Sequence, residues 1–148
     1  MKNLKDAETA PFSLHAVTVN STGWGPAQEF LKSTDANLVL VQEHKLVGEE
    51  VEKARIWARS VGWCGIINEA RRTTEKKGKA SSSAGVAIFA RTGIGLRRDP
   101  IVTSRNDRVI AGIVESPGNP PLSVICAYFV TKSGMAGLNL ALLSEVSS

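Results

Sequence analysis

Apolar residues recur along the chain in short blocks whose spacing alternates between that of strands and that of helices. Residues 13–20 are rich in β-branched side chains and predict a strand. Residues 36–42 form a nearly continuous apolar run, which is typical of a strand covered on both faces. Between them, residues 26–34 begin with a proline and place apolar side chains at helical spacing. A second helix is expected from Gly48, because three glutamates there favour a helix start.

The second half of the chain is dominated by strand signals. Residues 62–68 predict the next strand, and residues 69–83 are polar and basic, which favours a loop. Three more strand-like segments with intervening turn residues follow, at residues 84–91, 108–116 and 121–129. A β-α-β-α-β start that continues into antiparallel strands predicts an α/β fold with a mixed sheet. Residues 1–12 are expected to form a polar arm, and residues 13–148 one domain that ends on an amphipathic helical stripe.

Composition and charge narrow the class of protein. The chain has 148 residues, of which 43% are hydrophobic and 22% charged, and this excludes a fibrous or disordered protein. The net charge of +4 is a weak indication of partners that carry phosphate or other acidic groups.

Targeting signals and cysteines suggest a compartment. No apolar stretch is long enough to span a membrane, and the N-terminus lacks the apolar core of a secretory signal. Membrane partners are therefore not expected. Cys64 and Cys126 lie in apolar surroundings and are expected to be buried free thiols, which suits a reducing compartment. A nuclear or cytoplasmic location follows as the default expectation.

Polar residues follow three of the predicted strands, and these residues are the candidates for chemistry. Asn20 ends the first strand, Glu43 follows the apolar run, and Tyr128 lies near the end of the last strand. Polar groups at the carboxyl ends of strands tend to gather along one rim of an α/β sheet. A carboxylate, an amide and a phenol on one rim suit Mg²⁺ and a phosphate oxygen.

The same residues also have ordinary structural interpretations. Asn20 precedes a Ser-Thr-Gly sequence and is a natural turn residue. A glutamate after a strand is usually solvated, and a tyrosine in a strand usually packs against neighbours. From periodicity alone, these interpretations are the stronger ones. Trp24 could stack on a sugar or base, although burial is the commoner fate of an indole.

The order of four short motifs changes this balance. These are Val-Thr-Val-Asn ending at Asn20, Gln42-Glu43 after an apolar strand, Ala-Gly-Val-Ala-Ile from Ala84, and Ala-Tyr-Phe at residues 127–129. In this order they resemble the endonuclease/exonuclease/phosphatase superfamily. Its members include apurinic/apyrimidinic endonucleases and the endonuclease domains of non-LTR retrotransposons. The resemblance implies a DNase I-like α/β sandwich and covers nearly the whole chain.

The resemblance also implies roles for individual residues. Glu43 would coordinate a divalent cation, Mg²⁺ or Mn²⁺. Asn20 would orient the metal site or the nucleophile, and Tyr128 would contact or support the scissile phosphate. The implied reaction is phosphodiester hydrolysis, with nucleic acid as the partner and DNA favoured over RNA.

The sequence departs from the superfamily pattern in two ways. Thr22 stands where the repair endonucleases carry an acidic residue, and nothing after Tyr128 matches their Gly-Asp-x-Asn or Ser-Asp-His motifs. The chain therefore resembles an N-terminal half whose single sheet leaves one apolar face uncovered. This implies partial folding, self-association or pairing with a missing C-terminal half. The chain would be a fragment, a subunit that needs a partner, or a degenerate relative used for binding.

Basic residues give the last set of candidates. Phosphate-backbone contacts are predicted for a set of lysines and arginines near the rim and in the basic loop: Lys45, Arg71, Arg72, Lys76, Lys77 and Lys79. The alternative is a solvated loop without a partner. The sequence therefore predicts two alternative functions. The first is Mg²⁺-dependent endonuclease-like hydrolysis, by a chain that alone is weakly active or inactive. The second is a non-catalytic module that binds nucleic acid or protein.

Overall fold

The computed structural model describes residues 13–74, 80–100 and 106–129. The described residues contain two helices and nine strands, which follow one another in the order β1 (Ala16–Asn20), α2 (Trp24–Ser33), β2 (Leu38–Gln42), α3 (Glu49–Ser60), β3 (Trp63–Asn68), β4 (Arg71–Thr74), β5 (Ala80–Ser83), β6 (Val86–Arg91), β7 (Gly95–Arg98), β8 (Val109–Glu115) and β9 (Leu122–Ala127). The predicted N-terminal arm and C-terminal helical stripe lie outside these residues. None of the described helices is both long and apolar enough to cross a bilayer.

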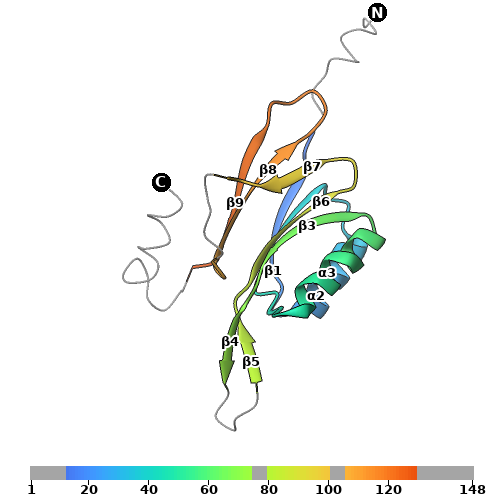
Figure 1. Ribbon diagram of the computed structural model, residues 1–148. Helices are drawn as coiled ribbons and strands as arrows, with labels where there is room; N and C mark the ends of the chain where they lie inside the picture. The colour runs from blue at the N-terminus through green and yellow to red at the C-terminus, as the bar shows by residue number, and fades with distance from the viewer. Residues whose placement is uncertain (1–12, 75–79, 101–105, 130–148) are drawn as a thin grey trace, which may run out of the picture.

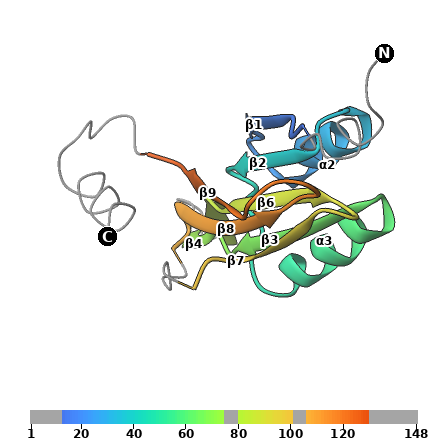
Figure 2. The same ribbon diagram turned by 90° about the horizontal axis from the view of Figure 1, so that it is seen from above.

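The predicted β-α-β-α-β start is confirmed. Strands β1 and β2 pair in parallel, and β6 then pairs antiparallel with both β2 and β3. The result is a mixed four-stranded sheet in the order β1-β2-β6-β3, which can be followed from one edge to the other in Figure 2. Strands β2 and β6 lie in the middle, which explains why their sequences are almost continuously apolar.

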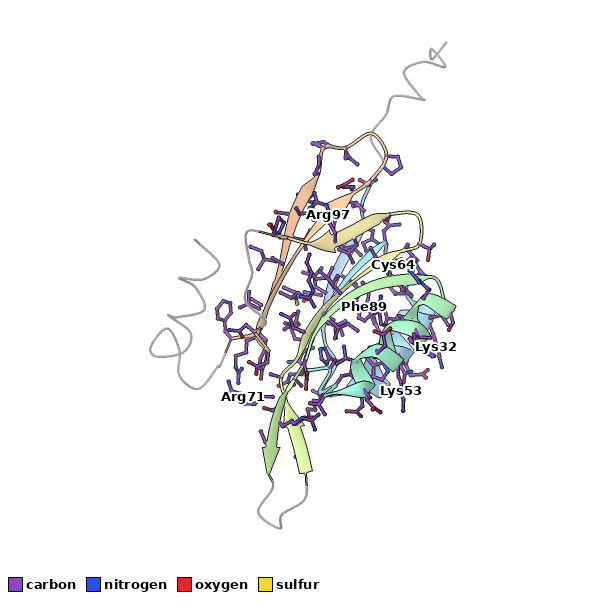
Figure 3. The ribbon with its side chains drawn as sticks, in the orientation of Figure 1. Lys32, Lys53, Cys64, Arg71, Phe89 and Arg97 are labelled. Carbon is purple, nitrogen blue, oxygen red and sulfur yellow. The ribbon has the colours of Figure 1, made fainter. Side chains whose placement is uncertain are left out.

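Helices α2 and α3 cover one face of this sheet (Figure 1). Apolar side chains of both helices pack against the sheet residues that point the same way, with Phe89 at 0% exposure among them. Figure 3 shows Phe89 between the sheet and the helices, whereas Lys32 and Lys53 lie on the helical side. Helix α2 begins at Trp24, two residues before Pro26, because a proline in the first turn interrupts no helical hydrogen bond.

A second sheet covers the opposite face. Strands β7, β8 and β9 pair antiparallel, and their inner side chains pack against Leu38, Ile88 and neighbouring residues of the first sheet. The expectation of a single sheet with one uncovered face is therefore wrong. Strand β7 was not predicted, because Gly-Leu-Arg-Arg carries no alternation and is a strand only through its pairing with β8.

The prediction of a basic loop at residues 69–83 is also wrong, because much of this segment forms a β-hairpin. Strands β4 and β5 pair antiparallel, with Arg71 opposite Ser83 and Thr74 opposite Ala80. The hairpin projects beyond the rest of the described structure (Figure 1). It has no apolar stripe in its sequence, which is why the hydrophobic pattern gave no strand signal. Lys76, Lys77 and Lys79 lie outside the described residues.

Candidate functional site at the sheet rim

The carboxyl ends of β1, β2 and β3 lie at one rim of the sandwich, beside the starts of β6 and β8 and the end of β9. The register fixes this arrangement. Asn20 lies opposite Gln42, Asn68 opposite Val86, and Val109 opposite Ala127. The residues that follow or precede these strand ends therefore belong to neighbouring loops. This is the rim that the sequence predicted for the candidate chemistry.

Glu43 and Tyr128 are in direct contact at this rim. The Tyr128 hydroxyl donates a hydrogen bond to Glu43 Oε1 at 2.5 Å, although the two residues are 85 positions apart. Glu43 follows the first sheet and Tyr128 follows the second, so the bond joins the two sheets. Tyr128 is held in place by its own amide, which donates to the Arg108 carbonyl at 2.8 Å. The predicted grouping of these two residues is what the structure shows.

Arg108 is a third member of the site, and the sequence did not single it out. Its guanidinium lies 5.2 Å from the centre of the Tyr128 ring, within the range of a cation–π contact. Its Nε is buried and has no hydrogen-bond partner within the described residues. The sequence signal that points to Arg108 is its position as the first residue of the strand-like segment 108–116, which places it at the start of that strand.

The electrostatics of the site are dominated by the Glu43 carboxylate. The hydrogen bond from Tyr128 to Glu43 raises the pKa of the phenol above its usual value, and burial and the carboxylate charge add to this effect. The Arg108 charge opposes it. The phenol is therefore a hydrogen-bond donor at neutral pH, and Glu43 is the acceptor.

The side chain of Asn20 makes a local hydrogen bond in the turn after β1. Its side chain is exposed, and its Oδ1 accepts a hydrogen bond from the Thr22 amide at 3.3 Å, as a turn residue does. Thr22 Oγ1 donates to the Ser21 carbonyl at 2.7 Å. Asn20 lies at the same rim as Glu43, and the bonds that its side chain makes belong to the turn after β1.

Backbone strain is concentrated at this rim. Among the described residues, four that are not glycine have φ in the left-handed region, and each lies in a rim loop: Thr22, Glu43, Lys45 and Ala84. Such conformations persist only where surrounding contacts hold them, and they are enriched at functional sites. The segment from Glu43 to Lys45 is thus built to a specific shape, which a solvated loop does not need.

The donors at the rim suit only a weakly held divalent cation. Glu43 supplies one carboxylate, and Thr22 occupies the position where the resemblance implies a second. Within the described residues, no cluster of three or more histidine, cysteine, aspartate or glutamate side chains could enclose a metal ion. Mg²⁺ keeps several of its waters and often binds through one or two carboxylates. One carboxylate with Oε1 already bonded to Tyr128 therefore fits a largely hydrated ion.

The basic residues near the rim are partly engaged with acids. Arg71 Nε lies 3.6 Å from Asp107 Oδ2, and Arg72 Nε lies 3.9 Å from Glu69 Oε1. Arg71 and Arg72 belong to β4, at the base of the projecting hairpin, and Figure 3 shows the first of them there. Lys45 is exposed in the loop after β2. These side chains lie on the protein surface beside the rim, where solvent screens their ion pairs.

The sequence also predicted burial for Trp24 and for the two cysteines. Trp24 is partly buried and packs against Trp57 and Phe89, with ring centres 5.7 and 5.9 Å apart, so its ring faces the core and is not a free stacking platform. Cys64 and Cys126 are free thiols, as expected, but only Cys126 is buried.

Comparison with known proteins supports the fold and leaves the function open. No known family profile and no curated protein matches the chain. Solved structures do match. The 3′ phosphatase NExo from Neisseria, bound to a product DNA hairpin, is 17% identical, with a TM-score of 0.54 over 90% of this chain and 48% of that one. The DNase I-like fold that the sequence resemblance implied is thereby confirmed.

Two further structures have similar values. The endonuclease domain of TRAS1, a telomere-specific non-LTR retrotransposon, is 12% identical, with a TM-score of 0.53 over 91% of this chain and 51% of that domain. The AP endonuclease LMAP from Leishmania major is 14% identical, with a TM-score of 0.54 over 99% of this chain and 53% of that enzyme. The chain spans about half the length of the structures it matches.

Proposed function

We propose that the rim is a phosphodiesterase site of the endonuclease type, in which Glu43 holds Mg²⁺ or Mn²⁺ near a nucleic-acid phosphate. The observation that carries this proposal is the contact between Glu43 and Tyr128 across the two sheets, with Arg108 beside it. A carboxylate, a phenol and a guanidinium gathered on a strained rim are suited to a cation and an anionic phosphate.

The residues of this chain have distinct roles in the proposal. Tyr128 donates to Oε1 of Glu43 and fixes the carboxylate, so that Oε2 would be the oxygen that holds the cation. Arg108 adds positive charge beside the phosphate and stabilises the negative charge that develops there. A bound divalent cation would supply charge neutralisation of the phosphate and activation of a water. Asn20 would orient the nucleophile from the neighbouring turn.

We propose DNA, in preference to RNA, as the nucleic acid. Lys45, Arg71 and Arg72 lie on the surface next to the rim, and Lys76, Lys77 and Lys79 belong to the connection between β4 and β5 in the sequence. Contacts of this kind are independent of sequence and weaken as salt rises. The Neisseria enzyme, whose fold is similar, was solved with a bound DNA hairpin, which supports the proposal of DNA.

A second candidate function is a non-catalytic nucleic-acid-binding module. The observation that favours it is Thr22, which replaces an acidic ligand, together with a single carboxylate at the metal position. General bases and phosphate-binding groups each contribute orders of magnitude to the rate. Since the motifs that carry them in the superfamily have no match in this chain, we propose that its own activity is weak or absent.

The experiment uses the 148-residue chain with an abasic-site duplex and a supercoiled plasmid, in the presence and absence of Mg²⁺. The variant is Glu43→Gln, and the matched control is Glu115→Gln, on the outer face of the second sheet. The proposal expects DNA binding that weakens with salt, and slow Mg²⁺-dependent nicking that only Glu43→Gln removes. Binding without any nicking selects the second candidate. Nicking that survives Glu43→Gln overturns the proposed role of Glu43.

A further inference from the structure

His44 is buried between Glu43 and Lys45, and both of its ring nitrogens are engaged. Its side chain is 0% exposed. The Leu46 amide donates to Nδ1 at 2.9 Å, so Nδ1 is unprotonated and Nε2 carries the hydrogen. Nε2 then donates to the Asn68 carbonyl, also at 2.9 Å. Burial lowers the pKa of the imidazole to about 4, which agrees with a neutral ring.

Asn68 continues this line of hydrogen bonds into the second sheet. Its Nδ2 donates to the carbonyl of Asn106 at 2.9 Å and to that of Val109 at 2.8 Å, where β8 begins. Its Oδ1 accepts from Arg98 Nη1 of β7 at 2.7 Å. Asn68 is 2% exposed, and its bonds to the His44 ring and the Val109 carbonyl are buried, whereas those to Asn106 and Arg98 are partly buried. We call the pair His44 and Asn68 the buried polar bridge.

The bridge ends close to both partners of the candidate site. At one end, His44 is flanked by Glu43 and Lys45, whose φ values of 60° and 62° need an external restraint. The restraint includes Gly85, where a Cβ would come within 2.4 Å of the His44 ring. At the other end, Asn68 bonds to Asn106 and Val109, which lie on either side of Arg108 in the sequence. The Arg108 carbonyl in turn accepts a hydrogen bond from the Tyr128 amide.

We infer that the buried polar bridge positions Glu43 against Tyr128, and that His44 and Asn68 are positioning residues of the site. Each sheet supplies one of the two partners, and the apolar packing between the sheets is not directional. A line of hydrogen bonds with fixed geometry sets the distance between the two strand ends. This inference rests on the proposed function of Glu43 as a cation ligand.

The test compares four versions of the full chain: wild type, His44→Phe, His44→Gln and Ile94→Ala. His44→Phe keeps an aromatic ring, of somewhat larger size, and removes both hydrogen bonds, whereas His44→Gln retains an amide that can donate to the Asn68 carbonyl. Ile94→Ala is the control for lost stability, because Ile94 is a core residue of the β6–β7 turn, at the opposite end of β6 from the rim.

The first readout is Mg²⁺ affinity, followed by nuclear magnetic resonance. Removing groups that orient a metal ligand typically costs 10–100-fold in affinity, so we expect His44→Phe to weaken binding about tenfold or more. We expect His44→Gln to recover much of the loss and Ile94→Ala to bind as wild type does. Wild-type affinity in His44→Phe, or an equal loss in Ile94→Ala, overturns the inference.

The second readout does not need a metal. Hydrogen exchange is measured at the Gly23 amide, which donates to the Glu43 carbonyl at 2.7 Å, and at the Tyr128 amide. We expect His44→Phe to speed exchange at both sites selectively, and Ile94→Ala to have no such selectivity. If wild type shows no Mg²⁺ response, the proposed function fails while this readout still decides the bridge. Should His44→Phe not fold, Asn68→Ala gives the same test from the other end.

Discussion

The two sheets of this protein differ in how completely they are covered. In the four-stranded sheet, the five residues from Val86 to Ala90 of β6 are each 0% exposed, because helices cover one face and the second sheet covers the other. In the three-stranded sheet, the inner face is packed, but Ile125 on β9 is 40% exposed and Leu122 is 49% exposed.

Because of this difference, the two sheets contribute unequally to the stability of the fold and to the geometry of the candidate site. Burial of apolar surface is worth about 25 cal/mol per Å², so the four-stranded sheet and its helices supply most of the stabilisation. The three-stranded sheet buries less, yet it carries Tyr128 and Arg108 to the rim. The candidate site lies where the two sheets meet, so it depends on the alignment of the sheets more than on the depth of either core.

The largest expected effect comes from the doubly covered sheet. Phe89→Ala removes a fully buried ring that contacts Trp24, and the cavity should lower the free energy of unfolding by about 3–5 kcal/mol. Urea denaturation followed by tryptophan fluorescence measures the change. A loss below about 1 kcal/mol would mean that the first sheet does not dominate stability.

The next effect concerns pH and the bridge between the sheets. Burial lowers the pKa of His44 from 6.5 to about 4. Between these two pH values, the imidazole is therefore protonated in the unfolded chain and neutral in the folded chain. The stabilisation that comes from keeping His44 neutral is therefore fully present above pH 6.5. As pH falls from 6.5 to about 4, the free energy of unfolding decreases by about 3 kcal/mol. Unfolding measured across this range should show the loss in wild type and a flatter profile in His44→Gln. Equal slopes in both proteins would show that His44 is not held neutral.

A smaller effect is expected at the contact between the sheets. Tyr128→Phe removes only the hydroxyl that donates to Glu43, and loss of one hydrogen bond at a half-buried position should cost about 1 kcal/mol. Unfolding and Mg²⁺ affinity should be measured together, with Phe129→Leu as a neighbouring control. If Tyr128→Phe changes neither quantity, the contact does not couple the sheets.

The smallest effect is expected on the outer face of the second sheet. Ile125→Ser replaces an exposed apolar side chain and should change the free energy of unfolding by less than about 0.5 kcal/mol. The same comparison on the buried Ile110 of β8 should cost several-fold more. A large loss at Ile125 would mean that this face is covered in solution, by another copy or another part of the chain, and light scattering would distinguish the two.

The sequence by itself determined the elements that have an apolar pattern of their own. Strands β1, β2, β3, β6, β8 and β9 and helices α2 and α3 each carry the spacing that buries one or two faces, and this spacing is local to the segment. The place of Glu43 at the rim also followed from the sequence, because a carboxylate directly after a buried strand must lie at its end. Tyr128 was placed there by the same reasoning.

Only the tertiary structure decided how these elements meet. Strands β4, β5 and β7 are polar or charged, so their pairing partners make them strands and their own pattern does not. The second sheet could not be separated from the first, because inward-facing apolar residues have the same periodicity in either. Arg108, His44 and Asn68 acquire their roles from hydrogen bonds and contacts across 20 to 41 positions of sequence. Such bonds depend on the packing of the whole chain, whereas hydrophobic spacing depends only on neighbours along it.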